Sequence, residues 1–261
     1  MSATAVPQEL DDGRMSLMEH LTELRDRIIK IVVAIAVGMF AAFALYEYIY
    51  DFLIQPYVDL ANARDLGLGD DDRLLITDPL EGFGIRMKTS LYAGIALAMP
   101  VILWQVWRFV TPGLYSHEKR YAIPFLLSAL TLFVLGAGLA YYTLPRALEF
   151  LVDIGGSDNF IVAYSPAKYF KLITYMMLAF GIGFEFPILL IFMQMAGIVG
   201  PRQLASVRRY AIVGICVLVA VITPSGDPIS MLMLSVPMVI FYEVAIIVGR
   251  IMERRRSVAT A

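Results

Sequence analysis

Six apolar stretches separated by charged segments limit what this chain can fold into. Their approximate bounds are 28–50, 86–107, 121–144, 169–196, 210–223 and 229–249. A helix rises about 1.5 Å per residue, so about 20 residues cross a hydrocarbon core of roughly 30 Å. Only 17% of the residues are charged, whereas soluble domains carry about 25%. We therefore predict an all-α integral membrane protein with six transmembrane helices.

The fifth stretch, 210–223, is the shortest, because as a helix it reaches only about 21 Å. On length alone it is equally compatible with a buried core helix. The distribution of positive charges requires a crossing at this place, so we interpret the stretch as a span. We expect the fifth and sixth spans to be short and the bilayer to be thin beside them.

The distribution of Lys and Arg predicts the orientation of the chain. Most of these residues lie before the first span, between spans two and three, between spans four and five, and after the sixth. The intervening loops carry few of them and many aspartates. By the positive-inside rule, both termini face the cytoplasm. Three further cations, Arg86, Lys88 and Lys171, fall near the outer ends of spans.

The chain is expected to form a single membrane domain with two tails. Residues 1–15 should be a disordered cytoplasmic tail, 16–250 the six-span domain and 251–261 a second cytoplasmic tail. The first apolar stretch is too long for a cleaved signal peptide, whose apolar region has about 7–15 residues. No internal repeat is visible in the sequence, so an inverted-repeat transporter receives no support.

Local capping signals predict where several helices begin. Ser16 and Glu19 form a capping box, so a helix should start at Leu17, lie along the inner surface and run into the first span. A capping residue followed by proline predicts three more starts, at Asp78-Pro79 (with Glu81 as a box residue), Ser165-Pro166 and Asp227-Pro228. Prolines in or near the spans favour a curved bundle with a concavity. These are Pro100, Pro124, Pro187 and Pro237.

Glu185 lies in the middle of the apolar stretch 169–196. A central charge costs about 2.5–3.5 kcal/mol on insertion scales, so the side chain should face the bundle or a wet cavity. Gly181 and Gly183 before it and Pro187 after it predict a thin, kinked helix that a ligand or helix can approach. A structural hydrogen bond to another span is the alternative.

Two further carboxylates, Glu23 and Glu118, are predicted to be cytoplasmic. Glu23 lies four residues before Arg27, so a helical ion pair explains it equally well. Glu118 lies near a helix start, where the helix dipole favours an acid. Asp227 is explained as an N-cap. The residues alone leave a functional role open for each of them.

The sequence gives no sign of a cofactor, a catalytic centre or a nucleic-acid site. One Cys and two His are too few for a metal cluster, and the net charge of −2 gives no basic field. No glycine-rich phosphate loop and no pair of nucleophile and base is visible, so an enzyme is not predicted. A proton-coupled small-solute transporter with Glu185 as the proton carrier stays open, although few other polar residues lie at membrane depth.

Four stretches of the chain form a specific combination of motifs. They are HLTELRDR at 20–27, PVILWQVWRFVTPGLYSHEKR at 100–120, AFGIGFEFP at 179–187 and ITPSGDPIS at 222–230. In order and spacing, over about residues 16–250, the chain resembles the TatC family, the large polytopic subunit of the twin-arginine protein translocase.

The resemblance implies six transmembrane helices in a curved, glove-like bundle in the cytoplasmic membrane of a prokaryote, with both termini cytoplasmic. It implies a receptor for the signal peptides of folded exported proteins, which carry two adjacent arginines. It also implies the core of a translocase that uses the proton-motive force. The expected partners are these signal peptides, the small single-span subunits TatA and TatB, and further copies of the chain, with no cofactor and no nucleic acid.

In the family, two cytoplasmic glutamates bind the signal peptide, and they match Glu23 and Glu118. Carboxylates suit this task because each can bind a guanidinium through two parallel hydrogen bonds. The membrane-embedded glutamate of the family matches Glu185, toward which the apolar part of the peptide would lie. Other matched positions near the cytoplasmic surface are Arg25, Phe109, His117, Lys119 and Arg120.

The sequence departs from the family at Met231. Many members carry a glutamine there, within a polar cluster that docks the single-span partners. Thr223 and Asp227 of this cluster are present, but Met231 cannot make the hydrogen bonds of a glutamine. Ser225 and Gly226, which precede Asp227, look like an insertion.

Overall fold

The computed structural model describes residues 17–64, 78–110, 122–155 and 165–259. Within these ranges the chain forms nine helices and no strand. The helices are α1 (Leu17–Ala44), α2 (Tyr46–Arg64), α3 (Pro79–Val110), α4 (Ala122–Gly155), α5 (Pro166–Phe184), α6 (Phe186–Met195), α7 (Pro201–Ser206), α8 (Arg208–Ile222) and α9 (Pro228–Ala259). The prediction of an all-α protein is confirmed for the part of the chain that the structure describes.

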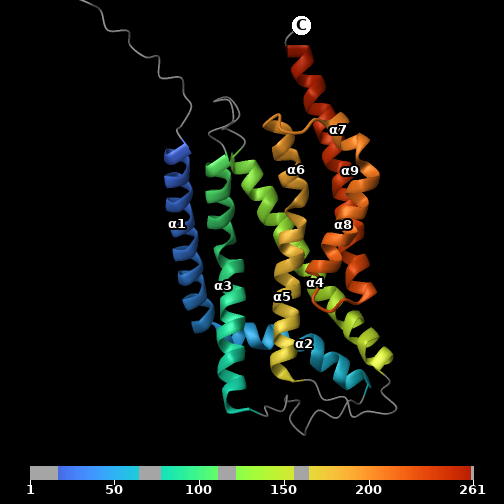
Figure 1. Ribbon diagram of the computed structural model, residues 1–261. Helices are drawn as coiled ribbons and strands as arrows, with labels where there is room; N and C mark the ends of the chain where they lie inside the picture. The colour runs from blue at the N-terminus through green and yellow to red at the C-terminus, as the bar shows by residue number, and fades with distance from the viewer. Residues whose placement is uncertain (1–16, 65–77, 111–121, 156–164, 260–261) are drawn as a thin grey trace, which may run out of the picture.

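Five helical stretches are long and apolar enough to cross a membrane by length and composition. They are α1, α3, α4, α5 together with α6, and α9. The fifth predicted span, α8, has 15 residues and is not among them. It forms an antiparallel hairpin with α9 (Figure 1). The molecule is therefore a multi-pass membrane protein.

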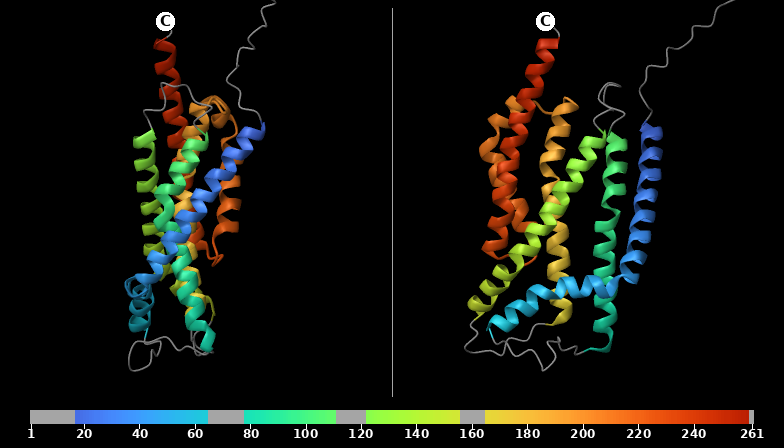
Figure 2. Two further views of the ribbon diagram at one scale, coloured as in Figure 1. Left: turned by 90° about the vertical axis from the view of Figure 1, so that its left-hand side faces the viewer. Right: turned by 180° about the vertical axis from the view of Figure 1, so that it is seen from behind.

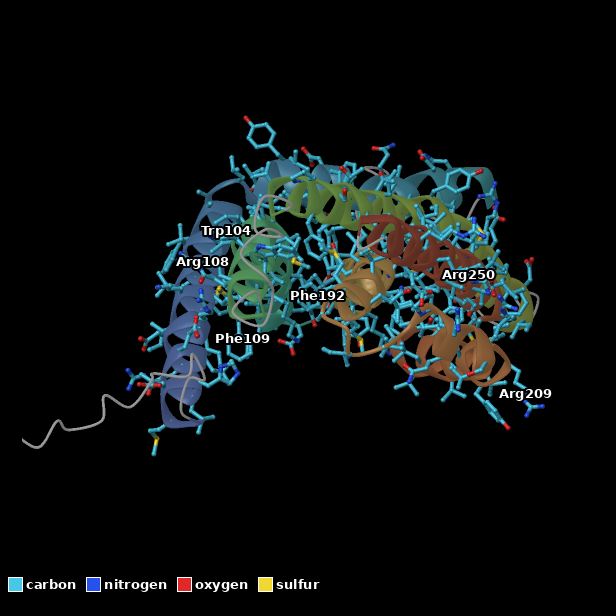
Figure 3. All side chains as sticks on the ribbon, turned by 90° about the horizontal axis from the view of Figure 1, so that it is seen from above. Trp104, Arg108, Phe109, Phe192, Arg209 and Arg250 are labelled. Carbon is cyan, nitrogen blue, oxygen red and sulfur yellow. The ribbon has the colours of Figure 1, made fainter. Side chains whose placement is uncertain are left out.

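The helices are arranged in a curve. The start of α1 and the end of α9 lie at the same end of the molecule, which we call the upper end (Figure 1). Seen from that end, α1 and α8 stand at the two tips of an arc, α4 runs along its back, and α5 and α6 lie near its centre (Figure 3). Consistent with this central place, Phe170, Ile173, Met176 and Phe180 of α5 are almost fully buried.

The predicted helix starts at Leu17, Pro79, Pro166 and Pro228 are confirmed. At two of them a carboxylate caps the first turn, because Oδ1 of Asp78 accepts from the Leu80 N–H at 2.8 Å and Oδ1 of Asp227 accepts from the Ser230 N–H at 2.7 Å. The hydroxyl of Ser165 does not cap its own helix. It donates instead to Oε1 of Glu81 at 2.6 Å, so a carboxylate of α3 holds the start of α5.

The first span differs from the prediction of 28–50. The segment expected to lie along the inner surface continues without a break into one straight helix, α1, which ends at Ala44 (Figure 1). α2 then crosses the lower ends of α3 and α5 (Figure 2). Arg86 of α3 accounts for the early end, because its Nη2 donates to the Phe43 carbonyl at 3.3 Å and its guanidinium lies 4.4 Å from the Phe43 ring centroid.

The sixth predicted span, 229–249, is the first part of a longer helix, since α9 has 32 residues and extends beyond the other helices at the upper end (Figure 1). The α8–α9 hairpin nevertheless extends less far toward the lower end of the molecule than α3 and α5 do (Figure 1). Its turn lies above the lower ends of α3 and α5 (Figure 1). α8 and α9 therefore end early at the lower side because of where their turn is placed, and not because α9 is a short helix (Figure 1).

α1 and α3 cross at two glycines. A Cβ atom on Gly94 would lie 2.5 Å from the backbone nitrogen of Met39, and one on Gly38 would lie 2.5 Å from the Gly94 carbonyl oxygen. Both contacts are with backbone, which cannot rotate away as a side chain can. Small residues allow this kind of close approach between membrane helices.

Replacing Gly94 with alanine is expected to force α1 away from α3 and to destabilise the protein by about 1–3 kcal/mol, as overpacking does. Gly84→Ala on the same helix is the matched control, because no atom lies within 4 Å of the position that its Cβ would take. Alanine also has the better helix propensity. Thermal unfolding of the purified variants in detergent measures the difference, and equal midpoints would contradict the close crossing.

Candidate functional site

The upper ends of α1 and α3 form a charged cavity of about 440 Å³. Its lining includes three carboxylates and three cations, which are Glu19, Glu23, Asp26, Arg27, Lys30 and Arg108. Glu23 and Arg27 lie one helical turn apart and form the predicted ion pair, with Nε of Arg27 donating to Oε1 of Glu23 at 3.1 Å. Nη2 of Arg27 donates to the same oxygen.

The second oxygen of Glu23, Oε2, is buried and has no hydrogen-bond partner among the described residues. Arg27 is held away from it by α3, since Nη1 of Arg27 donates to Oε1 of Gln105 at 3.3 Å. Gln105 is itself only 9% exposed. A buried carboxylate oxygen without a donor is unfavourable. The arrangement therefore offers an acceptor that an incoming guanidinium can satisfy.

An aromatic pair lies beside this cavity. The rings of His20 on α1 and Phe109 on α3 stack with their centroids 4.6 Å apart. Figure 3 shows Phe109 and Arg108 at the upper end of α3, next to α1. Arg25, in contrast, pairs with Asp26 at 2.9 Å, is 68% exposed and does not line the cavity. The structure thus places Phe109 against His20, one helical turn before Glu23, and leaves Arg25 at the surface.

Four predicted site residues lie outside the described residues. They are His117, Glu118, Lys119 and Arg120. Their predicted role in signal-peptide binding stays a prediction.

Glu185 lies at the break between α5 and α6 and borders a second cavity, of about 320 Å³. The other lining residues, among them Leu103, Trp107 and Phe192, are apolar or glycine. Neither carboxyl oxygen of Glu185 has a hydrogen-bond partner in the described part of the chain. The expected alternative, a structural hydrogen bond to another span, is therefore absent among those residues.

The helix assignment is interrupted just before Pro187, because α5 ends at Phe184 and α6 begins at Phe186. Proline lacks the N–H that would continue the helix. Gly181 differs from expectation, because a Cβ there would lie 2.6 Å from the ring of Phe133, so α4 already fills the space beside it. Only Gly183 of the two glycines borders the cavity.

The predicted docking residues lie at the lower end of the α8–α9 hairpin. The hydroxyl of Thr223 donates to the Val219 carbonyl at 2.8 Å, and Asp227, 3% exposed, binds Ser225 and caps α9. Met231 is half-buried and packs against the hydrophobic core. Their polar atoms thus hold the turn itself together, which agrees with the N-cap interpretation of Asp227.

Sequence reasoning missed Gln105 as a member of the first site. Its contact with Arg27 joins residues 78 positions apart, so no local pattern reports it. One signal was available, because Gln105 lies one turn before Arg108 and Phe109 on α3 and is polar within an otherwise apolar stretch.

Comparisons with known proteins agree with these observations. A family model described as "Sec-independent protein translocase protein (TatC)" matches residues 19–237. A protein of that name from Frankia casuarinae is 40% identical over 250 residues, which cover 94% of this chain and 68% of the relative. The namesake from Aquifex aeolicus is 39% identical over 245 residues, covering 93% of this chain and 98% of the relative.

A solved structure, described as the twin arginine translocase receptor TatC in the detergent DDM, has the same fold. Its TM-score is 0.73 at 39% sequence identity, over 88% of this chain and 99% of that chain. From the order of the helices, the family model and these relatives, the chain belongs to the TatC family of Sec-independent protein translocase proteins.

Proposed function

We propose that the protein is the signal-peptide receptor and core subunit of a twin-arginine translocase, a transport component and not an enzyme. It exports folded proteins across the cytoplasmic membrane of a prokaryote with the proton-motive force. The upper end faces the cytoplasm, in line with the positive-inside rule. The family membership supports this function, and the relatives named above are called translocase or receptor.

The observation that carries the proposal is the buried, unpartnered Oε2 of Glu23 in the charged cavity at the upper end. A guanidinium can donate two hydrogen bonds to a carboxylate, whereas an ammonium acts as a point charge. Glu118 provides the second carboxylate, so that each arginine of the motif has its own acceptor. By their match to family positions, we also assign a part in peptide binding to Arg25, Phe109, His117, Lys119 and Arg120.

The apolar segment of the signal peptide would follow the concave side of the bundle toward Glu185. The partners TatA and TatB would present single helices there, and Glu185 would form hydrogen bonds with a polar group on such a helix. We also assign Thr223, Asp227 and Met231, at the turn of the α8–α9 hairpin, to the docking of these partners. Further copies of the chain complete the assembly.

A proton-coupled small-solute transporter is disfavoured by the surroundings of Glu185. A proton relay needs neighbouring titratable or hydroxyl groups, and apart from Glu185 the cavity is lined by apolar residues and glycine.

The test is binding of a twin-arginine signal peptide to the purified protein, with a twin-lysine peptide of otherwise identical sequence as the control. We expect the arginine peptide to bind at least about tenfold more tightly, because it alone can form the forked hydrogen bonds. Equal binding of the two peptides would refute the receptor function.

A further inference from the structure

A third cavity, of about 330 Å³, lies between the lower ends of α3 and α5. It is distant from both sites described above, since those lie at the upper end and at the α5–α6 break. Two lysines that do not fit the positive-inside pattern, Lys88 and Lys171, line it. Neither lysine side chain forms an ion pair or hydrogen bond with any other residue in the described ranges. The third such cation, Arg86, is already engaged with Phe43.

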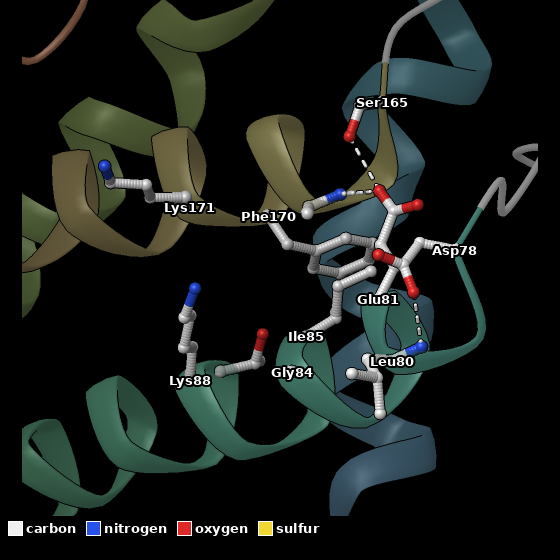
Figure 4. Close-up of a pocket in the computed structure, with 11 residues that line it drawn as sticks. Asp78, Leu80, Glu81, Gly84, Ile85, Lys88, Ser165, Phe170 and Lys171 are labelled. Atoms are coloured by element: carbon white, nitrogen blue, oxygen red, sulfur yellow. Dashed lines mark hydrogen bonds between the residues drawn. The ribbon is translucent and has the colours of Figure 1, made fainter.

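The cavity has charges of opposite sign at its two ends. Figure 4 shows Lys88 and Lys171 on one side of Phe170 and Ile85, and Asp78 and Glu81 on the other. Asp78 is exposed, and among the described residues its carboxylate binds only the Leu80 N–H, a neutral donor. The negative charge of Asp78 is thus not balanced there, just as the positive charges of the two lysines are not.

The acidic end is held in place by hydrogen bonds between two helices. Oε1 of Glu81 accepts from the Ser165 hydroxyl at 2.6 Å and from the Ala167 N–H at 3.1 Å (Figure 4). The cavity is therefore built by α3 and α5 together and keeps its shape at that end. Between its two ends the cavity is lined by the apolar side chains of Ile85 and Phe170, which form its floor. Both side chains are packed into the protein, since they are only 6% and 2% exposed.

Along the helices, the carboxylates of the cavity lie outermost and the lysines lie nearer to the membrane centre. A zwitterionic lipid headgroup has the matching order, with its ammonium group outside its phosphate. The span containing α3 has 31 residues and is therefore about 46 Å long, so its ends project beyond a hydrocarbon core of roughly 30 Å. Asp78 lies at the very end of α3, while Lys88 lies about 15 Å nearer to the membrane centre. Lysine side chains extend toward the headgroups from such positions.

We propose that this cavity binds the headgroup of an ethanolamine phospholipid. Lys88 and Lys171 bind the phosphate, and Asp78, with Glu81 beside it, accepts hydrogen bonds from the primary ammonium group, which is the outermost part of such a lipid. The apolar floor receives the start of an acyl chain. A choline headgroup lacks N–H donors for Asp78, and a glycerol headgroup lacks the positive charge.

The test uses the full-length protein purified in detergent and native mass spectrometry with three lipids that share dioleoyl chains. These are phosphatidylethanolamine, phosphatidylcholine and phosphatidylglycerol. We expect one ethanolamine lipid to be retained at least about tenfold more than either of the others, since one charge-assisted hydrogen bond contributes about that factor. Equal retention of all three lipids, or equal retention of the ethanolamine and glycerol lipids, would overturn the proposal.

Substitutions at the two ends of the cavity test which end binds the phosphate and which end binds the ammonium group. The double variant K88Q/K171Q should retain the ethanolamine lipid less than the unaltered protein does, because it lacks the cations that bind the phosphate. K168Q, which removes an exposed lysine of α5 outside the cavity, should retain this lipid undiminished. D78N preserves the N-cap, because asparagine also caps helices, and should retain the ethanolamine and choline lipids equally. Undiminished retention of the ethanolamine lipid by K88Q/K171Q would show that the lysines do not bind the phosphate. Signal-peptide binding, measured in the same preparations, should be unchanged in all of these variants.

Discussion

Replacing Glu23 with glutamine is expected to lower the affinity for a twin-arginine peptide by at least about 30-fold. Removing the charge from one partner of a buried, hydrogen-bonded charge pair costs about 2–5 kcal/mol, and about 1.4 kcal/mol corresponds to a factor of ten. The affected atom is Oε2, which is buried and has no donor among the described residues until a guanidinium arrives.

Folding should survive this change. Glutamine has the shape of glutamate and keeps an acceptor for Arg27, whose contact with Gln105 is also retained. Arg27 thus keeps hydrogen-bond acceptors from both helices and is not left unpaired by the change. The thermal midpoint in detergent should therefore shift little, and a loss of binding can be attributed to the site.

Asp26→Asn is the matched control for Glu23→Gln. Asp26 lies on the same helix, lines the same cavity and carries the same charge, but its side chain is 52% exposed and pairs with Arg25. Its removal should change peptide binding by less than about threefold, since exposed pairs contribute little. If both variants bind the peptide equally well, Glu23 is not the acceptor and only the overall charge of the cavity matters.

Replacing Glu185 with alanine is expected to reduce export per inserted molecule at least about tenfold, while glutamine should retain most of the activity. The two oxygens of Glu185 are the polar atoms of an otherwise apolar cavity, and neither has a partner within the described residues. A hydrogen bond to a polar group of an incoming helix is satisfied by glutamine as well as by glutamate. About 1.4 kcal/mol for such a bond corresponds to the tenfold effect.

Leu189→Ala controls for the loss of volume. Leu189 lies one turn after Glu185, lines the same cavity and is 55% exposed, so its truncation enlarges the cavity without removing a polar atom. Export should be nearly normal in this variant. Failure of both the alanine and the glutamine variant of Glu185 would indicate that the charge itself is needed. Normal export with alanine would remove Glu185 from the functional residues.

The helix starts could be predicted from the sequence because capping is local. Asp78 and Asp227 bind N–H groups two and three residues further along the chain, and this spacing is visible in the letters alone. The end of α1 could not be predicted in this way. It depends on Arg86, which is 43 residues away from Phe43 and reaches the bare carbonyl only after α1 and α3 have packed.

In the candidate site, too, local contacts could be predicted from the sequence and contacts between helices could not. The pair of Glu23 and Arg27 follows from helical spacing, whereas the contact with Gln105 requires the close crossing of α1 and α3. Glu81 is the instructive case, because the capping-box pattern assigned it to its own helix. Its Oε1 binds the start of α5 instead, since the packing of α3 against α5 places Ser165 within reach.

α8 packs against fewer helices than the other walls of the cavity beside Glu185 do, and this difference affects how the cavity can open. The walls from α3, α4 and α5 are interlocked with one another, whereas α8 packs chiefly against α9 and contributes Leu218 and Ile222 to the lining. Its turn also stops short of the lower end of the bundle (Figure 1). α8 is therefore the compliant side of the cavity. Under the proposed function, a partner helix would widen the cavity by moving α8, with the smallest loss of packing. The carboxylate of Glu185 would then meet its partner without any rearrangement of the opposite walls.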